Sequence, residues 1–222
     1  MFVLRSPATQ ATHALPAYTH DMSGRSYIKQ GNTSLTLTTQ YVIDQAMKML
    51  YTAGEIAKKV QELGEEISHV YQGTELYVVG ILKGGVIFMS DLVRQINLPV
   101  KIDFARISSY GSADRPQCDV KIVEDIRETI QGKHVIIVDD IMDTGHSLYA
   151  FKKHLEAKGP TSVKICTMID KTARREATLT PDYYGFRIND GFVVGYGLDF
   201  AEDYRTLPDL YVLDPNDRRD PL

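Results

Sequence analysis

Runs of apolar residues alternate with polar segments along most of the chain, and they predict a set of strands. Residues 76–82 and 135–138 contain no charged side chain, which is typical of strands buried on both faces of a parallel sheet. Shorter or mixed apolar runs predict further strands at residues 100–107, 120–123, 163–169, 183–188, 192–196 and 210–213.

Apolar residues three and four positions apart predict helices between these strands. The first helix is expected to begin after Thr52, because Thr52 and Glu55 have the spacing of a capping box. Its apolar face consists of Ile56, Val60, Leu63 and Ile67. Residues 86–96 predict a second helix, and a third is expected to open near residue 144.

The alternation of strands and helices predicts an α/β fold. This order favours a Rossmann-like, mostly parallel sheet flanked by helices, with right-handed connections. Residues 1–45 differ from the pattern, because Arg5 is the only charged residue before Thr19 and no apolar run is as long as a signal peptide requires. We therefore predict a flexible N-terminal extension over residues 1–45 and one domain over residues 46–222.

Composition and charge narrow the functional classes. Of the 222 residues, 43% are hydrophobic, so a buried core is expected. Lys and Arg total 25 against 29 for Asp and Glu, and the net charge of −4 argues against a general nucleic-acid or membrane binder. Cys118 and Cys166 fit no metal-ligand pattern, and no apolar run reaches the ~20 residues of a membrane span. The expected location is the cytoplasm.

Acidic residues follow the apolar run at 135–138. Asp139, Asp140 and Asp143 arrive in a predicted turn at the carboxyl end of a strand, where α/β sheets bind their ligands. Adjacent carboxylates need a cation or hydroxyl donors, because burying an unpaired charge is costly. Residues 144–147 then open a helix whose free amide groups suit a phosphate, and Gly145 permits close approach. The segment predicts a site for a sugar phosphate and a divalent metal.

Residues 138–147, V-D-D-I-M-D-T-G-H-S, resemble the phosphoribosyl-diphosphate signature of type I phosphoribosyltransferases. Other segments are similar, in the same order, to the 6-oxopurine branch of that family, the hypoxanthine-guanine phosphoribosyltransferases. They are L-K-G-G at 82–85, S-Y-G at 109–111, D-K at 170–171 and F-V-V-G-Y-G-L-D at 192–199, continuing to Tyr204 and Arg205. The resemblance implies the type I fold with a small hood.

The resemblance also implies an enzyme of purine salvage. It would transfer the 5-phosphoribosyl group from phosphoribosyl diphosphate to hypoxanthine or guanine, with xanthine as a further candidate, giving IMP or GMP and diphosphate. Asp143 would bind purine N7 and act as the catalytic proton acceptor. The phosphoribosyl and 5′-phosphate groups would be bound by Asp139, Asp140, Thr144, Gly145, His146 and Ser147. The diphosphate would be bound by Lys83, Gly84, Ser109, Tyr110 and Arg205.

Purine recognition is implied for Lys171, Phe192, Val193 and Asp199. Arg174 and Arg175 add charge just beyond Lys171. The family's cofactor is Mg²⁺, and the implied metal ligands are Asp139, Asp140 and Asp199. The family further implies a cis peptide before Lys83, a lid formed by residues 108–118, and a homodimer or homotetramer. Its partners would be small-molecule substrates, with no nucleic acid and no membrane.

Other functions compete with this interpretation. A non-catalytic regulator with the same fold would sense the ligand, but it is disfavoured because Asp143, Lys171, Phe192 and Asp199 are all present. A receiver-type domain would place its acidic pair after the first strand. A nicotinamide dehydrogenase would need a G-x-G-x-x-G motif. Gly195 could supply its first glycine, but Phe200 occupies the position of the third. The sequence does not rank hypoxanthine, guanine and xanthine.

Overall fold

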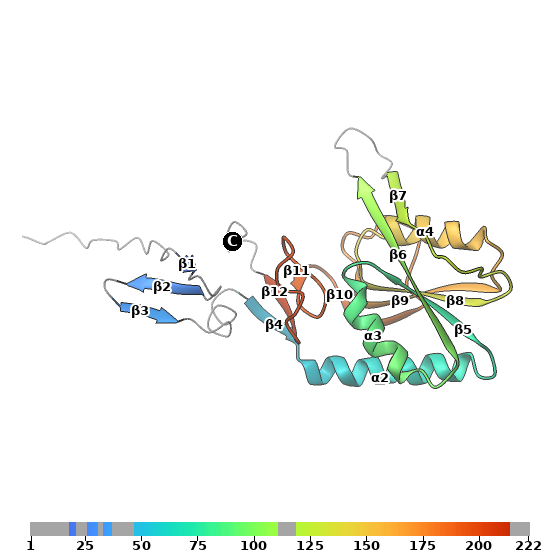
Figure 1. Cartoon of the computed structure of the whole chain (residues 1–222), viewed down its shortest axis with the longest axis horizontal. Coiled ribbons are helices and arrows are strands. Elements are labelled where there is room, and N and C mark those ends of the chain that lie inside the picture. Colours follow the sequence, from blue (N-terminus) through green and yellow to red (C-terminus); the bar gives the residue numbers. More distant parts are fainter. Residues whose placement is uncertain (1–17, 21–25, 31–32, 37–46, 111–118, 214–222) are drawn as a thin grey trace, which may run out of the picture. The chain divides into compact units, whose positions relative to one another are not determined.

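The computed structural model describes residues 18–20, 26–30, 33–36, 47–110 and 119–213 (Figure 1). The chain divides into two compact units, Met1–Ala46 and Met47–Leu222. The first unit contains a small antiparallel sheet in the order β1-β2-β3. Its strands are β1 (Tyr18–His20), β2 (Ser26–Gln30) and β3 (Thr33–Thr36). We did not expect these strands, and the flexibility of residues 1–45 stays a prediction.

The second unit is built around a six-stranded sheet in the order β10-β9-β8-β5-β6-β7. All neighbouring pairs are parallel except β6 and β7. The mostly parallel sheet predicted from the sequence is therefore confirmed. Its strands are β5 (Leu76–Ile81), β6 (Val100–Tyr110), β7 (Asp119–Glu124), β8 (His134–Met142), β9 (Ser162–Lys171) and β10 (Tyr183–Ile188).

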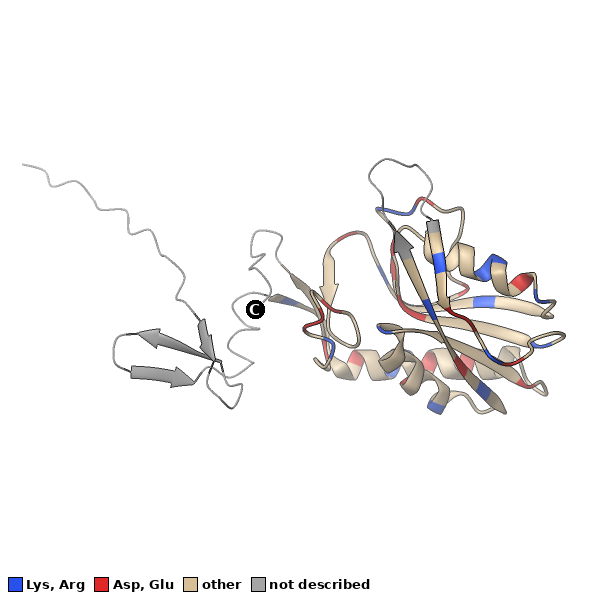
Figure 2. Cartoon of the chain, turned by 45° about the horizontal axis from the view of Figure 1, so that its top comes forward, with Lys and Arg blue, Asp and Glu red and all other residues tan. Residues whose placement is uncertain are grey.

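Helices cover both faces of this sheet and create two cores (Figure 1). On one face, α2 (Ala53–Val70) and α3 (Gly85–Gln95) pack against Leu76 and Val78 of β5. On the other face, α4 (His146–Glu156) packs with their neighbours Tyr77 and Val79. Successive residues of β5 thus enter opposite cores, as expected of a strand buried on both faces. The central strand β5 contains no charged residue, whereas Figure 2 shows charged residues on other strands of the sheet.

The predicted capping box at the start of α2 is confirmed. The Glu55 amide donates to the Thr52 hydroxyl, and the Thr52 amide donates to the Glu55 carboxylate. None of the helices in the described part of the chain has the length and apolar character needed to span a bilayer.

A three-stranded antiparallel sheet forms the hood, in the order β11-β12-β4. Its strands are β4 (Met47–Tyr51), β11 (Phe192–Val194) and β12 (Leu210–Leu213). The sequence did not predict β4, because its side chains are only partly buried and show no clear alternation. Tyr51 of β4 stacks on Phe186 of β10 with ring centroids 3.7 Å apart, so hood and main sheet share a contact.

Several predicted boundaries are wrong, and the strand predicted at 192–196 ends already at Val194. β8 continues to Met142, so Asp139 and Asp140 lie in the strand and not in the turn that follows it. The ladder with β9 explains this, since Asp139 pairs with Thr167 and Met142 with Asp170. Similarly, residues 108–110 of the predicted loop continue β6. Residues 111–118 lie outside the described part of the chain, so the lid stays a prediction.

Candidate active site

Two adjacent carboxylates mark the carboxyl end of β8. Asp139 and Asp140 are half-buried, and each accepts a hydrogen bond from the next backbone amide, at 3.0 Å and 2.8 Å. Removal from water, together with the negative charge of Asp140, raises the pKa of the Asp139 carboxyl well above its usual value. Burial also raises the pKa of Asp140. A bound cation would relieve both effects.

This pair of carboxylates suits Mg²⁺, which prefers oxygen ligands and often takes one or two carboxylates together with substrate phosphates. The described residues contain no group of three or more Asp, Glu, His or Cys side chains that could hold a metal alone. Asp199 is engaged elsewhere, because its carboxylate contacts Arg205 at 2.8 Å and the Glu202 amide at 2.8 Å. A metal at Asp139 and Asp140 would therefore take its other ligands from substrate or water.

The loop after β5 lies directly against these acids. The expected cis peptide between Leu82 and Lys83 is present. A Cβ added to Gly84 would lie 1.7 Å from the Asp140 carboxylate, and one on Gly197 would lie 2.3 Å from the Gly84 carbonyl oxygen. Only glycine fits at residue 197, whereas a side chain at residue 84 would displace the Asp140 carboxylate. Three segments thus meet at one place: the loop after β5, the acidic end of β8 and the hood segment around residue 197.

Two of the predicted diphosphate ligands converge on a single oxygen. Lys83 Nζ lies 2.9 Å from Glu202 Oε2, and an Arg205 guanidinium nitrogen lies 3.4 Å from the same atom. The ion pair with Lys83 is the main cause that lowers the pKa of Glu202. Sequence reasoning missed Glu202. Its carboxylate demonstrates that Lys83 and Arg205 can contact one anion together.

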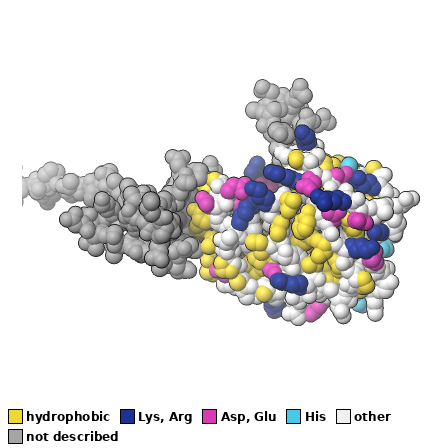
Figure 3. All heavy atoms as spheres, in the orientation of Figure 1, with side chains coloured by type: hydrophobic (Ala, Val, Ile, Leu, Met, Phe, Trp, Pro, Cys, Tyr) yellow, Lys and Arg dark blue, Asp and Glu magenta, His cyan; other side chains and the backbone are white. Residues whose placement is uncertain are grey.

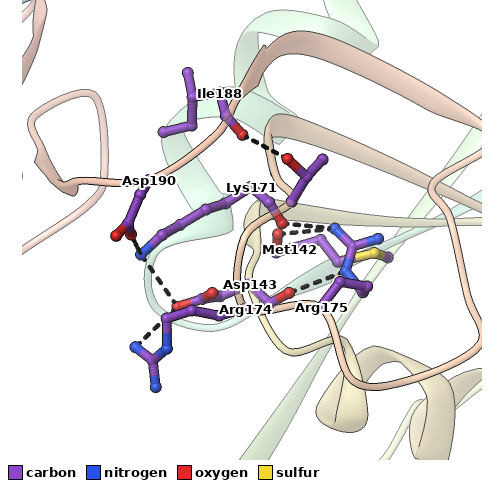
Figure 4. Close-up of polar contacts among 8 residues, drawn as sticks. Met142, Asp143, Lys171, Arg174, Arg175, Ile188 and Asp190 are labelled. Atoms are coloured by element: carbon purple, nitrogen blue, oxygen red, sulfur yellow. Dashed lines mark hydrogen bonds and ion pairs between the residues drawn. The ribbon is translucent and has the colours of Figure 1, made fainter.

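The carboxylate of Asp143, just after β8, faces the ammonium group of Lys171 at the end of β9 (Figure 4). Lys171 Nζ lies 3.4 Å from Asp143 Oδ2 and 3.2 Å from Asp190 Oδ1, and its side chain is only 8% exposed. Arg174 also reaches Asp143 Oδ2, at 3.4 Å. The other oxygen, Asp143 Oδ1, is buried and has no hydrogen-bond partner in the described part of the chain. A donor and an unused acceptor therefore lie side by side.

The turn after Asp143 leads into α4 as predicted. Gly145 is the N-cap of α4, and its φ of 86° is in the left-handed region that favours glycine. No side chain caps the helix start, so the first amides of α4 remain suited to an anion. His146 Nε2 is 2.7 Å from Glu176 Oε2, which ties the imidazole to a neighbouring loop. The backbone amide of His146 is among the first amides of α4.

The predicted purine residues of the hood differ in exposure. Phe192 is 47% exposed and meets Phe200 edge to face, with ring centroids 5.4 Å apart. One face of Phe192 can therefore stack on a base. Val193 is buried in β11 opposite Val212, so it offers only its backbone. Ser109 and Tyr110 end β6, but their side chains are outside the described part of the structure.

A cavity of about 450 Å³ lies elsewhere, between α2, α3 and residues 206–208. It is lined mainly by apolar side chains, including Ile56, Val60, Ile87 and Leu207. No residue predicted for the site lines it. The chemistry-bearing residues instead gather at the open carboxyl edge of the sheet beneath the hood.

Comparison with known proteins identifies relatives of this chain. Residues 46–201 match the family model described as "Phosphoribosyl transferase domain". The hypoxanthine phosphoribosyltransferase of Haemophilus influenzae is 44% identical over 162 residues, which cover 72% of this chain and 90% of that protein. The hypoxanthine-guanine phosphoribosyltransferase of Bacillus subtilis is 41% identical over 76% of this chain and 93% of its own length. A crystal structure of the Staphylococcus aureus hypoxanthine phosphoribosyltransferase matches with a TM-score of 0.78 and 37% identity, over 83% of this chain and 100% of that one.

Proposed function

The chain belongs to the phosphoribosyl transferase domain family, and on that basis we propose how its site acts on a 6-oxopurine. The protein is a phosphoribosyltransferase of purine salvage, related to the hypoxanthine and hypoxanthine-guanine enzymes. It uses small-molecule substrates, phosphoribosyl diphosphate and a purine base. No comparison supports the alternative of a non-catalytic ligand sensor with the same fold.

The pairing of Asp143 with Lys171 carries the choice of substrate. Hypoxanthine and guanine present a carbonyl oxygen at position 6 beside an N–H at position 7. The unused Asp143 Oδ1 can accept the N7 proton, and the Lys171 ammonium can donate to the 6-oxo group. Adenine places an amino group where Lys171 donates, so two donors would face each other. The arrangement therefore favours 6-oxopurines.

The ribose and its 5′-phosphate are proposed to lie across the start of α4. The carboxylates of Asp139 and Asp140 accept hydrogen bonds from the ribose hydroxyls. The backbone amides of residues 144–147 hold the phosphate, because the helix start has free donors and a favourable dipole. These contacts place C1 of the ribose toward the purine.

The leaving diphosphate is proposed to lie between the loop after β5 and the hood. Lys83 and Arg205 face one anion from two sides, and the Gly84 backbone lies beside them. Mg²⁺ held at Asp139, Asp140 and the substrate would neutralise charge on the leaving diphosphate. A second ion at Asp199 would require that carboxylate to release Arg205 or the Glu202 amide. As the C1–oxygen bond breaks, purine N9 bonds to C1 and the N7 proton passes to Asp143. Closure of residues 108–118, including Ser109 and Tyr110, would exclude competing water.

We propose that the enzyme is cytoplasmic and assembles as a homodimer or homotetramer. Large apolar side chains are exposed on β6 and β7, among them Ile102 at 51%, Phe104 at 37% and Val123 at 51%. Hydrophobic side chains also gather in the middle of the face seen in Figure 3. Such surfaces favour association. Light scattering after size-exclusion chromatography should give a mass two or four times 25.0 kDa, and a monomer mass would contradict this proposal.

The proposed substrate class is tested by incubating the protein with Mg²⁺, phosphoribosyl diphosphate and one base at a time. Hypoxanthine and guanine should each give a nucleotide. The kcat/KM for adenine should be lower by at least about 1000-fold, because a site built around hydrogen bonds strongly rejects a mismatched base. Xanthine in a parallel reaction extends the ranking. Comparable rates with adenine and hypoxanthine would contradict the role of Lys171, and no nucleotide from any 6-oxopurine would contradict the function.

A further inference from the structure

Among the described residues beside the site, Arg175 has the most hydrogen-bonded side chain, and it is not one of the predicted site residues. It is only 14% exposed and follows Lys171 in the loop between β9 and β10. Its guanidinium nitrogens lie 2.5–3.1 Å from five acceptors, three of which share the two hydrogens of Nη2. They are the Met142, Asp143, Lys171 and Leu179 carbonyl oxygens and the Asp170 carboxylate.

Four of these acceptors lie at the ends of two neighbouring strands, which Arg175 therefore links. Met142 ends β8 and Asp143 follows it directly, while Asp170 and Lys171 end β9. The sheet register pairs Met142 with Asp170, so both strand ends lie beside each other above one guanidinium. In Figure 4 the side chain of Lys171 extends away from Arg175 while its carbonyl group points toward Arg175. Arg175 therefore holds the backbone from which the Asp143 and Lys171 side chains project.

Arg175 also contacts the segment proposed to bind phosphate. A Cβ added to Gly145 would lie 3.2 Å from Arg175 Cδ, so the side chain packs directly under the start of α4. One residue thus contacts or bonds to the proton acceptor, the purine donor and the phosphate-binding turn through their backbones.

The charge of Arg175 is compensated by a buried carboxylate. Asp170 is 1% exposed, and its second oxygen accepts a hydrogen bond from Arg187 at 2.8 Å. Arg187 is 50% exposed, and within the described part of the chain it bonds to Asp170 and lies over the Tyr184 ring, 4.4 Å from its centroid, rather than contacting Asp143 or Lys171. The two arginines therefore share one carboxylate but differ in their relation to the site. This difference separates a role in positioning from a role in burying Asp170.

We propose that Arg175 is a positioning residue that sets the distance and direction between Asp143 and Lys171. The inference rests on the proposed function. Fixed peptide groups keep the proton acceptor and the 6-oxo donor at the spacing of one purine edge, so the base is aligned as C1 is attacked. A shift of about 1 Å in such a constellation can cost about 100-fold in rate.

The test compares Arg175→Lys with wild type. Lysine keeps the aliphatic stem against Gly145 and the positive charge, but it cannot reproduce the planar fork that serves several acceptors. We expect kcat with hypoxanthine to fall about 100-fold, as for a misplaced catalytic group. The Kd for phosphoribosyl diphosphate, measured by calorimetry, should change by less than about threefold, because the phosphate contacts remain. A merely structural role would not split kcat from binding in this way.

Arg187→Lys is the matched control. It changes the other guanidinium on Asp170 and should leave kcat within about threefold of wild type, as for substitutions away from a site. An Arg175→Lys enzyme with kcat within about threefold of wild type would overturn the proposal. Equal losses in both variants would overturn it as well, because burial of Asp170 would then be the cause. Wild-type protein that forms no nucleotide would instead contradict the proposed function.

A second variant covers the case in which Arg175→Lys does not fold. The double variant Asp170→Asn with Arg175→Gln removes both charges of the pair, so no buried charge is left uncompensated. If it folds, as judged by circular dichroism, low kcat supports the proposal and wild-type kcat overturns it. If neither variant folds, Arg175 is required for folding and the positioning role is overturned.

Discussion

The Asp143→Asn enzyme is expected to form IMP about 1000-fold more slowly than wild type at saturating substrates, in the middle of the range for loss of a general base. Asparagine has the size of aspartate but does not take up the N7 proton as N9 bonds to C1. The unused Asp143 Oδ1 is the atom on which this expectation depends. Steady-state kcat, followed by the absorbance change on nucleotide formation, measures the loss.

Asp125→Asn provides the matched control for this substitution. Asp125 is also a partly buried carboxylate with basic partners, His154 at 2.7 Å and Lys158 at 2.8 Å, but it lies outside the site. Its loss should leave kcat within about threefold of wild type. An Asp143→Asn enzyme that keeps more than about a tenth of wild-type kcat would contradict the role of Asp143 as proton acceptor.

Lys171→Gln is expected to abolish most of the discrimination between hypoxanthine and adenine. A glutamine amide offers both a donor and an acceptor, whereas the buried Lys171 ammonium offers only donors. We expect the ratio of kcat/KM for hypoxanthine to that for adenine to fall by about 1000-fold, because rejection by a polar site depends on donors that match one base. The measurement is kcat/KM for each base with both enzymes.

Lys164→Gln controls for the loss of a lysine on the same strand. Lys164 is also in β9, but it pairs with Asp182 at 2.7 Å, away from the predicted site residues. The Lys164→Gln enzyme should have the same ratio of kcat/KM for hypoxanthine to kcat/KM for adenine as wild type. If Lys171→Gln also keeps the wild-type ratio, Lys171 does not read the 6-oxo group, and Asp190 at 3.2 Å from it becomes the next residue to examine.

Much of the parallel sheet could be predicted from the sequence because burial on both faces leaves a clear signal. β5 and the first part of β8 are uninterrupted apolar runs. The same signal failed at the end of β8, where Asp139 and Asp140 continue the ladder but face the site. Polar residues at a strand end look like a turn in sequence, since function there replaces core packing. β4 was missed because its side chains are only partly buried.

Only part of the candidate site could be predicted from the sequence. The acids and Gly145 were predicted from the chemistry of a phosphorylated sugar, whereas Lys83, Gly84 and Lys171 were implied only by the resemblance to a known family. Glu202 and Arg175 were not assigned roles, because their contacts depend on how distant segments meet. Arg175 was visible only as a charge beside Arg174, and its bonds to four carbonyl oxygens leave no pattern in the sequence. Such contacts require coordinates.

The most direct test of the account is the stoichiometry of the reaction. Wild-type protein is incubated with Mg²⁺, phosphoribosyl diphosphate and hypoxanthine, and IMP and diphosphate are quantified together. The account predicts one diphosphate for each IMP, and neither product in a parallel reaction without hypoxanthine. Diphosphate released without IMP would indicate hydrolysis of the substrate, and binding of phosphoribosyl diphosphate without either product would indicate a ligand sensor. Either result would contradict a phosphoribosyl transfer at this site.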